Sequence, residues 1–332
     1  MRVVEFREYG GPEVLRLAER PDPEPARGEV RVRVRYSGIN RADLLQRRGR
    51  YPTPAGFPAD IPGLEFAGTV ESVGEGCGLR AAGDRVMGVI AGGGYAEKVV
   101  VPERQTIRVP EGMSAREAGA VPEVFMTAWD ALFLQAGLKA GETLLIHAVG
   151  SGVGTAALYL AQAAGVRTVG TTRTDDKLDR ALGMGLDAGV LTGRGEDWAA
   201  EVLKRSERGV DVILDLVGAQ YTDGNQRVLA RRGRWMVVGV PSGNVGKIDL
   251  RQLMGRRASV TGTVLRARAV EERIALAREF ERTLVPLFES QRLRAVVDRS
   301  FPAAEAGSAH RYMEENRSFG AIVLSWDHTG TS

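Results

Sequence analysis

The stretch His147–Thr155, HAVGSGVGT, decides the fold of this chain. It follows an apolar run, 143–146, and precedes a segment of small residues with helical character, 156–164. A strand, a glycine-rich turn and a helix start together form an anion site, because the first N–H groups of the helix and its dipole face the ligand. The stretch therefore predicts a loop that binds the pyrophosphate of a dinucleotide. A tight turn without a ligand has the same pattern, and the strict G-x-G-x-x-G spacing fails because its last position is Thr155.

Three residues of this loop are the predicted phosphate contacts: Ser151, Gly152 and Val153. Gly152 lets the backbone approach the phosphates, and Ser151 adds a hydroxyl group to the same turn. Gly154 is expected to permit close packing of the helix on the preceding strand.

The chain around the loop alternates between apolar strands and helices, which is typical of a buried parallel sheet. Strands are expected at 143–147, 167–172, 210–216, 234–239 and 259–263, and helices at 155–164, 175–184 and 222–230. The first third is rich in strands and turns, and residues 29–40 alternate apolar and charged side chains. A long helix is expected at 270–289. The sequence thus predicts an α/β protein in which a doubly wound domain is inserted into a β-rich domain.

Composition excludes several classes of protein. The chain has 332 residues, a net charge of +3 and one cysteine, Cys77, so it has neither a disulfide framework nor a cysteine-rich zinc site. No apolar run approaches the roughly 20 residues that span a bilayer, and the amino-terminal segment resembles a strand, not a signal peptide. Basic residues are spread along the chain, so no nucleic-acid partner is expected. We expect a soluble, cytoplasmic protein with no membrane partner.

The end of the second strand of the doubly wound domain indicates which dinucleotide binds. NAD-binding folds usually place an acidic residue there, on the ribose 2′-hydroxyl group. This chain has Thr172 and Arg173 at that point and Lys177 one helical turn later. A hydroxyl group and two cations suit a 2′-phosphate, which favours NADPH over NADH, although a solvated basic face would have the same residues. Asp175 and Asp176 are expected to cap the following helix.

Several stretches together resemble the zinc-independent quinone oxidoreductases of the medium-chain dehydrogenase/reductase superfamily, especially the p53-inducible type. They are GINRADLLQRRGRYP (38–52), IPGLEFAGTVESVGEG, AGGGYAEKVVVPE, LLIHAVGSGVGTAAL, GRWMVVG and HRYMEENRSFGAIVL. The family's looser phosphate motif, A-x-x-G-x-x-G, matches Ala148 and Gly154, with Ser151 in the middle position as in the p53-inducible type. The resemblance implies a GroES-like catalytic domain, 1–120 and 264–332, around a Rossmann domain, 121–263, and reduction of quinones by NADPH.

The resemblance also bears on zinc. Zinc-dependent members of the superfamily place Cys, His and Cys around the catalytic metal, and the matching positions here are Asn40, Leu64 and Glu123. Leu64 cannot bind a metal ion, and Glu123 with its neighbour Glu65 lacks the usual nitrogen and sulfur ligands. No metal site is therefore predicted, and the acceptor must take a hydride without a Lewis acid.

Two residues are the predicted catalytic groups, again from the resemblance. Tyr51 matches a tyrosine that lines the substrate pocket, where a phenol could position a quinone oxygen or donate a proton. The alternative is a loop tyrosine that packs on Pro52 and Pro54. Asn40 matches an asparagine near the nicotinamide and the substrate, and it could also cap the helix at 41–47. Asp43 is expected to have a structural hydrogen-bonding role.

The remaining predicted cofactor contacts follow strand ends or come from the resemblance alone. Carboxyl ends of parallel strands are where such folds bind ligands. Thr127 matches a threonine near the cofactor, although a threonine inside a helix would look the same. The full set of these contacts is Thr127, Gly239, Val240, Thr263, Val264, Leu265 and Asn316. Thr192 replaces a tyrosine that the family often places against the adenosine phosphate.

Three functions are compatible with these sequence features. The first is an NADPH-dependent quinone reductase. The second is an NADPH-dependent reductase of conjugated carbon–carbon double bonds in enals, enones or enoyl thioesters, which needs an added proton donor. The third is an NADPH-binding protein without catalysis, such as a redox sensor or an RNA-binding protein. The resemblance also implies a homodimer formed through the edges of the Rossmann sheets, with 259–264 as the edge strand.

Overall fold

The structure is a computed structural model, and it describes residues 1–193, 195 and 197–327. The chain divides into two compact units, each of which is described by itself. Unit 1 comprises Met1–Met126 and Leu265–Ser332, and unit 2 comprises Thr127–Val264. In the described ranges, no helix combines the length and apolarity that a membrane crossing needs.

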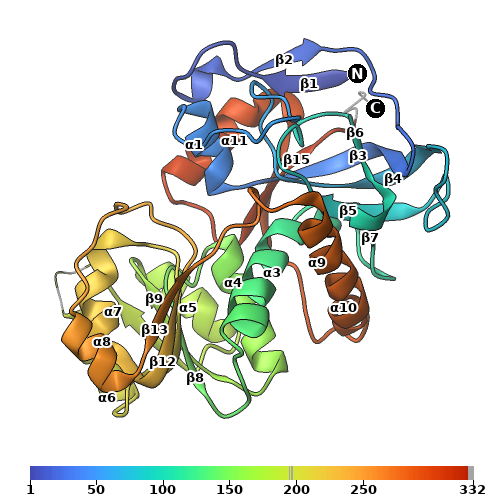
Figure 1. Ribbon diagram of the computed structural model, residues 1–332. Helices are drawn as coiled ribbons and strands as arrows, with labels where there is room; N and C mark the ends of the chain where they lie inside the picture. Colours follow the sequence, from blue (N-terminus) through green and yellow to red (C-terminus); the bar gives the residue numbers. More distant parts are fainter. Residues whose placement is uncertain (194, 196, 328–332) are drawn as a thin grey trace. The chain divides into compact units, whose positions relative to one another are not determined.

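Unit 1 is built on a largely antiparallel sheet (Figure 1). Its strands are β1 (Arg2–Glu5), β2 (Arg16–Glu19), β3 (Glu29–Ile39), β4 (Glu65–Val73), β5 (Arg85–Val89), β6 (Lys98–Pro102), β7 (Ile107–Arg108), β14 (Val297–Pro302) and β15 (Ala321–Ser325). The main sheet has the order β14-β15-β3-β4-β5-β7, with β6 also paired to β3. Strand β15 pairs antiparallel with β3, so the end of the chain returns to the sheet begun by its first third.

Helices and short turns complete unit 1. They are η1 (Pro12–Val14), α1 (Arg41–Arg47), η2 (Glu103–Gln105), α2 (Ala115–Ala118), α9 (Val270–Thr283), α10 (Val285–Glu289), η5 (Ala303–Glu305) and α11 (Ala306–Glu314), and α3 (Pro122–Trp129) begins here and runs into unit 2. Helices α1 and α11 contact each other. Strand β3 alternates buried valines with more exposed charged residues over its first half, as its sequence pattern predicts.

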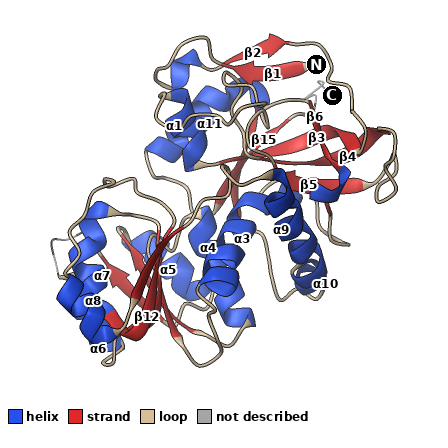
Figure 2. Cartoon of the chain, viewed as in Figure 1, coloured by secondary structure: helices blue, strands red, loops and turns tan. Residues whose placement is uncertain are grey.

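Unit 2 is a six-stranded, all-parallel sheet with helices on both faces, as Figure 2 shows. Its strands are β8 (Thr143–Ile146), β9 (Arg167–Thr172), β10 (Ala188–Leu191), β11 (Val210–Asp215), β12 (Leu229–Val237) and β13 (Ser259–Gly262). Its helices are η3 (Asp130–Gln135, a π-helix), α4 (Gly152–Ala163), α5 (Asp175–Gly183), α6 (Trp198–Arg205), η4 (Ala219–Tyr221), α7 (Thr222–Val228) and α8 (Leu250–Arg256). The α/β fold with a parallel Rossmann-like sheet is confirmed.

The strand order β10-β9-β8-β11-β12-β13 reverses direction next to β8. From β8 the chain first forms β9 and β10 on one side, and it then returns to form β11, β12 and β13 on the other side. Ligands bind at such a switch point, beyond the carboxyl ends of the strands. The loop that follows β8 is the predicted phosphate loop. The three apolar residues of β8 are completely buried: Leu144, Leu145 and Ile146. A strand buried on both faces explains why this segment is a continuous apolar run.

Three expectations about elements need correction. The helix expected at 270–289 is two helices, α9 and α10, which are separated by Leu284. Pro286 has no N–H group to continue the hydrogen-bond ladder. The helix expected at 222–230 ends at Val228, and β12 begins at the next residue, Leu229. Strand β10 and helices α6 and α8 were not expected.

Candidate active site and cofactor loop

The phosphate loop joins β8 to α4 in unit 2. Ser151 is the N-cap of α4, and its Oγ accepts a hydrogen bond from the Gly154 N–H group at 3.1 Å. Ser151, Gly152 and Val153 are partly exposed, whereas the next residues of α4 are buried. The Ser151 N–H group donates to the Ala148 carbonyl at 2.8 Å, so the helix start offers a phosphate the N–H groups of Gly152 and Val153 and the helix dipole.

Gly154 lies where the helix approaches the loop most closely. A Cβ atom at this position would lie 2.6 Å from the carbonyl oxygens of both Ala148 and Val149, which are backbone atoms. Only glycine fits without a shift of the loop. Ala148 itself has a left-handed φ of 49°, a conformation that costs energy for a residue with a Cβ atom. The loop thus has a strained and crowded backbone next to the helix start.

The predicted ribose contacts lie at the carboxyl end of β9 and in the turn and helix that follow it. Thr172 ends β9 with its side chain buried, Arg173 is exposed in the turn, and Lys177 lies in the first turn of α5. The N-cap of α5 is Thr174, so the two aspartates do not cap the helix but lie in its first turn. The Thr174 side chain hydrogen-bonds Asp176 and thereby lowers the pKa of that carboxyl group.

Tyr221 is a residue of this region that the sequence did not reveal. It ends η4, in the segment that follows β11, and hydrogen-bonds the side chain of Thr192. Burial raises the pKa of the Tyr221 hydroxyl group, and this hydrogen bond and the charge of Arg173 oppose the rise. A tyrosine is therefore present beside Thr192, although it comes from another part of the chain. Its only signal in the sequence is its position after a parallel strand.

His147 is a hydrogen-bonded core residue, as predicted. It is completely buried, its Nδ1 lies 2.9 Å from Thr171 Oγ1, and its Nε2 lies 2.7 Å from Asn225 Oδ1. Asn225 Nδ2 in turn donates to Asp215 at 3.0 Å. This network connects β8, β9, β11 and α7. Burial lowers the pKa of His147, and the charge of Asp215 and the hydrogen bond to Asn225 oppose this change.

The remaining predicted contacts of unit 2 lie after β12 and β13. The Gly239 N–H group donates to the Asp215 carbonyl at 3.2 Å, and Val240 is exposed. The Thr263 hydroxyl donates to Asp130 at 3.2 Å, and Val264 is exposed. Thr127 lies within α3, partly exposed. Their contacts with a cofactor stay predictions.

In unit 1, a pair of glutamates lies around the end of β3. Asn40 Nδ2 donates to Glu65 Oε1 at 2.7 Å, and the Glu123 N–H group donates to Glu65 Oε2 at 2.9 Å. Glu65 on β4 therefore connects the end of β3 to the start of α3. A Cβ atom at Gly38 would lie 2.1 Å from Glu65 Oε1, so the carboxylate lies directly against the backbone of β3.

Asp43 fixes Asn40 from the other side. Its carboxylate accepts hydrogen bonds from the N–H group of Asn40 at 2.7 Å, that of Gly63 at 3.1 Å, and the hydroxyl group of Tyr95 at 3.1 Å. Asn40 occupies the N-cap position of α1, but its side-chain amide is committed to Glu65. The expected structural role of Asp43 is confirmed by these bonds.

The hydrogen bonds behind Asp43 have a defined direction. Arg47 is only a donor, so His310 Nδ1, which lies 3.4 Å from Arg47 Nη1, must accept. The proton of the neutral ring is then on Nε2, which donates to the Tyr95 oxygen at 2.9 Å. The Tyr95 hydrogen therefore points to Asp43. Burial and the charge of Arg47 lower the pKa of His310 to about 3, which keeps the ring neutral.

Tyr51 does not pack simply on prolines. The guanidinium carbon of Arg266 lies 4.8 Å from the centroid of the Tyr51 ring, and Arg266 also donates to Gln46 Oε1 and Thr53 Oγ1. Burial raises the pKa of the Tyr51 hydroxyl group, and the charge of Glu123 raises it further. Arg266 follows directly after the predicted contact Leu265, and no motif in the sequence singles it out.

Burial gives the carboxyl groups of this cluster unusual pKa values. Burial raises the pKa of Asp43 to about 6 and that of Glu65 to about 7, although both accept hydrogen bonds. Burial, the charge of Glu65 and that of Asp43 together hold the pKa of Glu123 well above its usual range. Strongly shifted pKa values at one place are typical of functional sites.

The residues at this place do not fit a zinc ion. Leu64 is buried hydrocarbon, Asn40 directs an N–H group toward Glu65, and the Asp43 carboxylate is occupied by three donors. Among the described residues, no group of three or more His, Cys, Asp or Glu side chains is placed to hold a metal ion.

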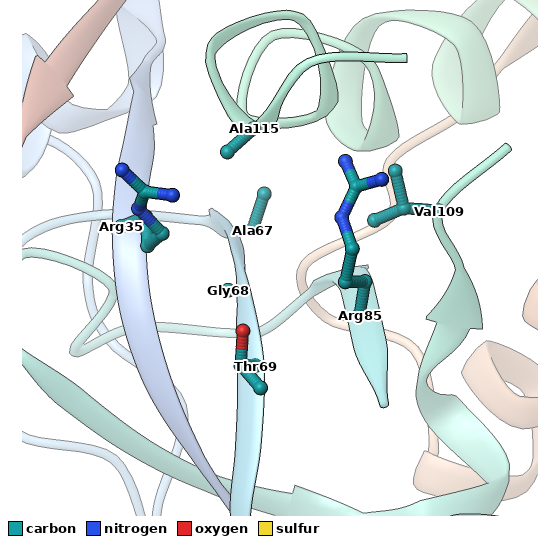
Figure 3. A pocket seen from close by; sticks show the side chains of 7 residues that line it. All are labelled: Arg35, Ala67, Gly68, Thr69, Arg85, Val109 and Ala115. Carbon is teal, nitrogen blue, oxygen red and sulfur yellow. The ribbon is translucent and has the colours of Figure 1, made fainter. Parts of the chain in front are cut away.

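Two further features of unit 1 are the turn at Asn316 and a pocket on the sheet. Asn316 has a left-handed φ of 56° in the turn after α11, accepts from Arg41 and donates to the Glu314 carbonyl at 3.0 Å; its predicted cofactor contact stays a prediction. A pocket of about 160 Å³ has Arg35 and Arg85 on either side of β4 (Figure 3). None of the predicted site residues lines this pocket.

Known proteins resemble this chain over nearly its whole length. Residues 26–111 match the family model "Alcohol dehydrogenase GroES-like domain", and residues 152–282 match "Zinc-binding dehydrogenase". The chain is 32% identical to the synaptic vesicle membrane protein VAT-1 homolog of Mus musculus, over 98% of this chain and 83% of the relative. It is 30% identical to the quinone oxidoreductase of Lama guanicoe, over 98% of this chain and 97% of the relative.

Solved structures show the same fold. An NAD-dependent alcohol dehydrogenase is 32% identical, with a TM-score of 0.87 over 98% of this chain and all of that one. The Escherichia coli quinone oxidoreductase complexed with NADPH is 29% identical, with a TM-score of 0.86 over 98% and 100% of the two chains. The CurK enoyl reductase is 27% identical, with a TM-score of 0.84 over 98% and 99%. From its sequence and its fold, the chain belongs to the medium-chain dehydrogenase/reductase superfamily of oxidoreductases.

Proposed function

We propose that this protein is an NADPH-dependent quinone oxidoreductase that works without a metal ion. The observation that carries the proposal is the donor set at Asn40, Leu64 and Glu123, which does not fit zinc. Alcohol oxidation in zinc enzymes relies on the metal as a Lewis acid. A site without one needs an acceptor that takes a hydride readily, and quinones meet this condition. The relatives named as quinone oxidoreductases support the choice.

The cofactor is NADPH, and residues of unit 2 fit it. Ser151, Gly152 and Val153 present the helix start to the pyrophosphate, while Arg173 and Lys177 offer cations to the 2′-phosphate. When bound, NADPH supplies a hydride to the acceptor. Ser151 at the middle position of the A-x-x-G-x-x-G motif supports, as part of this proposal, a likeness to the p53-inducible type.

The protein's own contribution is orientation and electrostatics. Tyr51 has a raised pKa, so its hydroxyl group stays protonated and can donate a hydrogen bond to a quinone oxygen. Asn40 is held in place by hydrogen bonds to Glu65 and Asp43, so its position does not have to be established at each turnover.

Reduction of conjugated carbon–carbon double bonds is the second candidate. The likeness to an enoyl reductase favours it, as does a carboxyl group of high pKa, because this reaction needs a proton donor. The two functions differ in which acceptor is reduced faster.

A panel of acceptors tests both functions. We expect oxidation of NADPH with a 1,4-quinone or a 1,2-quinone to have the highest kcat/KM, with a 2-alkenal slower and NADH a poorer cofactor. A higher kcat/KM for the 2-alkenal would favour the second function. A preference for NADH would contradict the role of Arg173 and Lys177.

A further inference from the structure

The hydrogen bonding of the Glu123 carboxyl group differs from that of Glu65 and Asp43. Its Oε2 is shut off from solvent and has no hydrogen-bond partner, although the side chain as a whole is partly exposed. The other two carboxyl groups of the cluster are satisfied: Glu65 accepts two N–H donors, and Asp43 accepts three donors. A buried carboxylate oxygen without a donor is costly, whereas a neutral carboxyl group in the same place costs far less.

The hydrogen bonds of the cluster therefore favour a proton on Glu123 over a proton on Glu65 or Asp43. Hydrogen-bond donors favour the charged form of Glu65 and Asp43, and nothing favours the charged form of Glu123 except the more distant Arg266. The groups that act on Glu123 are Glu65 and Asp43, which oppose its ionisation, and Arg266, which favours it. An ionised Glu123 would raise the pKa of the Tyr51 hydroxyl group, so the Glu123 carboxyl group lies near the predicted substrate residue.

We propose that Glu123 is a catalytic residue, a neutral carboxylic acid that hydrogen-bonds the carbonyl oxygen of the acceptor and protonates it during reduction. This role rests on the proposed function, and it applies to a quinone and to a conjugated enone alike. Tyr51 and Asn40 position the acceptor, and Glu65 is a positioning residue because its carboxyl group holds the Glu123 backbone N–H group.

The step balances in atoms and charge. As a hydride adds to one end of the conjugated acceptor, an electron pair moves to the carbonyl oxygen at the other end. The O–H bond of Glu123 breaks as the new O–H bond forms on that oxygen, which gives a hydroquinone or an enol. Glu123 is left as a carboxylate with a buried oxygen that has no hydrogen-bond donor, and water protonates it again before the next turnover.

Substitution of the acid separates proton transfer from binding. Glu123→Gln keeps the size of the side chain and a hydrogen-bond donor but has no proton to transfer. We expect kcat to fall on the order of 100-fold, with KM changed little. In the wild type, kcat should decline at high pH as Glu123 ionises, and this limb should disappear in Glu123→Gln. A small carboxylic acid such as acetic acid should restore part of the activity of Glu123→Ala.

The matched control is Glu111→Gln, an exposed glutamate of the same unit, which should leave kcat and the pH profile unchanged. A measurement without turnover is the infrared difference spectrum between wild type and Glu123→Gln at pH 7. A protonated carboxyl band that is lost in the variant supports the proposal, and a carboxylate band in its place overturns it.

Failure of this proposal can be told apart from failure of the proposed function. Turnover of quinones or enones that Glu123→Gln leaves at the wild-type rate and pH profile would overturn the role of Glu123 alone. Absence of turnover with NADPH on both classes of acceptor would overturn the proposed function and the role of Glu123 with it.

Discussion

At the scale of single residues, Gly154 controls the geometry of the phosphate loop. A Cβ atom would press on two backbone carbonyl oxygens at 2.6 Å, and neither can move without changing the loop. We expect Gly154→Ala to lower the free energy of unfolding by about 1–3 kcal/mol and to weaken NADPH binding. Thermal denaturation and a binding titration would measure both effects.

The control for this substitution is Gly183→Ala. Gly183 is the last residue of α5, and a Cβ atom there would have no atom within 4 Å. Alanine favours a helix over glycine, so the control should be neutral or slightly stabilising. Equal stability and NADPH affinity of Gly154→Ala and the wild type would show that the loop adapts.

Arg173 is the residue that we propose for recognition of the 2′-phosphate. Arg173 follows Thr172, and its charge acts on the hydroxyl group of Tyr221. Because Arg173 is exposed, its guanidinium group is accessible to a 2′-phosphate. We expect Arg173→Ala to weaken NADPH binding at least about tenfold, because a charged hydrogen bond contributes about 1.5–3 kcal/mol. NADH binding should change little. Arg208→Ala, at another exposed arginine of unit 2, serves as the control, and equal losses for both cofactors would contradict the assignment.

At the scale of elements, Glu65 joins three of them, because it lies on β4 and accepts from the end of β3 and the start of α3. Its pKa is about 7 in the folded protein and has an ordinary value of 4.5. The folded state therefore binds more protons than the unfolded state between these values, and Glu65 stabilises the fold less as the pH rises through this range.

This reasoning predicts a pH-dependent difference between wild type and Glu65→Gln. The difference in their free energies of unfolding, wild type minus variant, should decrease as pH rises from about 4.5 to about 7 and level off above it. The comparison removes the contribution of His310, whose lowered pKa has the opposite effect in both proteins. Urea denaturation at several pH values would measure it, and a constant difference would contradict a raised pKa of Glu65.

The helices and strands show most clearly which parts of the fold can be predicted from the sequence and which cannot. The β8–α4 unit was predictable because an apolar strand, a glycine turn and small helical residues are all local signals. The break at Leu284 was missed although Pro286 is visible, because the apolar period continues across it. The contact of Tyr221 with Thr192 and the raised pKa of Glu123 could not be predicted, because only the folded chain brings these residues beside their partners.

At the scale of the whole molecule, the remaining question is assembly. Strand β13 is an edge of the parallel sheet, as expected for 259–264, and an uncovered edge is a site for pairing with another chain. The elements before it expose large apolar side chains: Val245 is 83% exposed, Leu250 67% and Met254 76%. Exposed apolar residues clustered in sequence next to a sheet edge are typical of an interface. We therefore propose a homodimer formed through this edge of unit 2.

Charged substitutions at the proposed interface would test it. We expect the double variant Leu250→Glu/Met254→Glu to be a monomer in size-exclusion chromatography with light scattering, because a dimer would have to bury four additional charges. Leu182→Glu is the control, since Leu182 is 43% exposed on α5, away from β13 in the sheet order. It should leave the dimer intact. A wild-type protein that is monomeric at micromolar concentration, or a double variant that still dimerises, would contradict the proposed interface, and the exposed side chains of α8 would then need another partner.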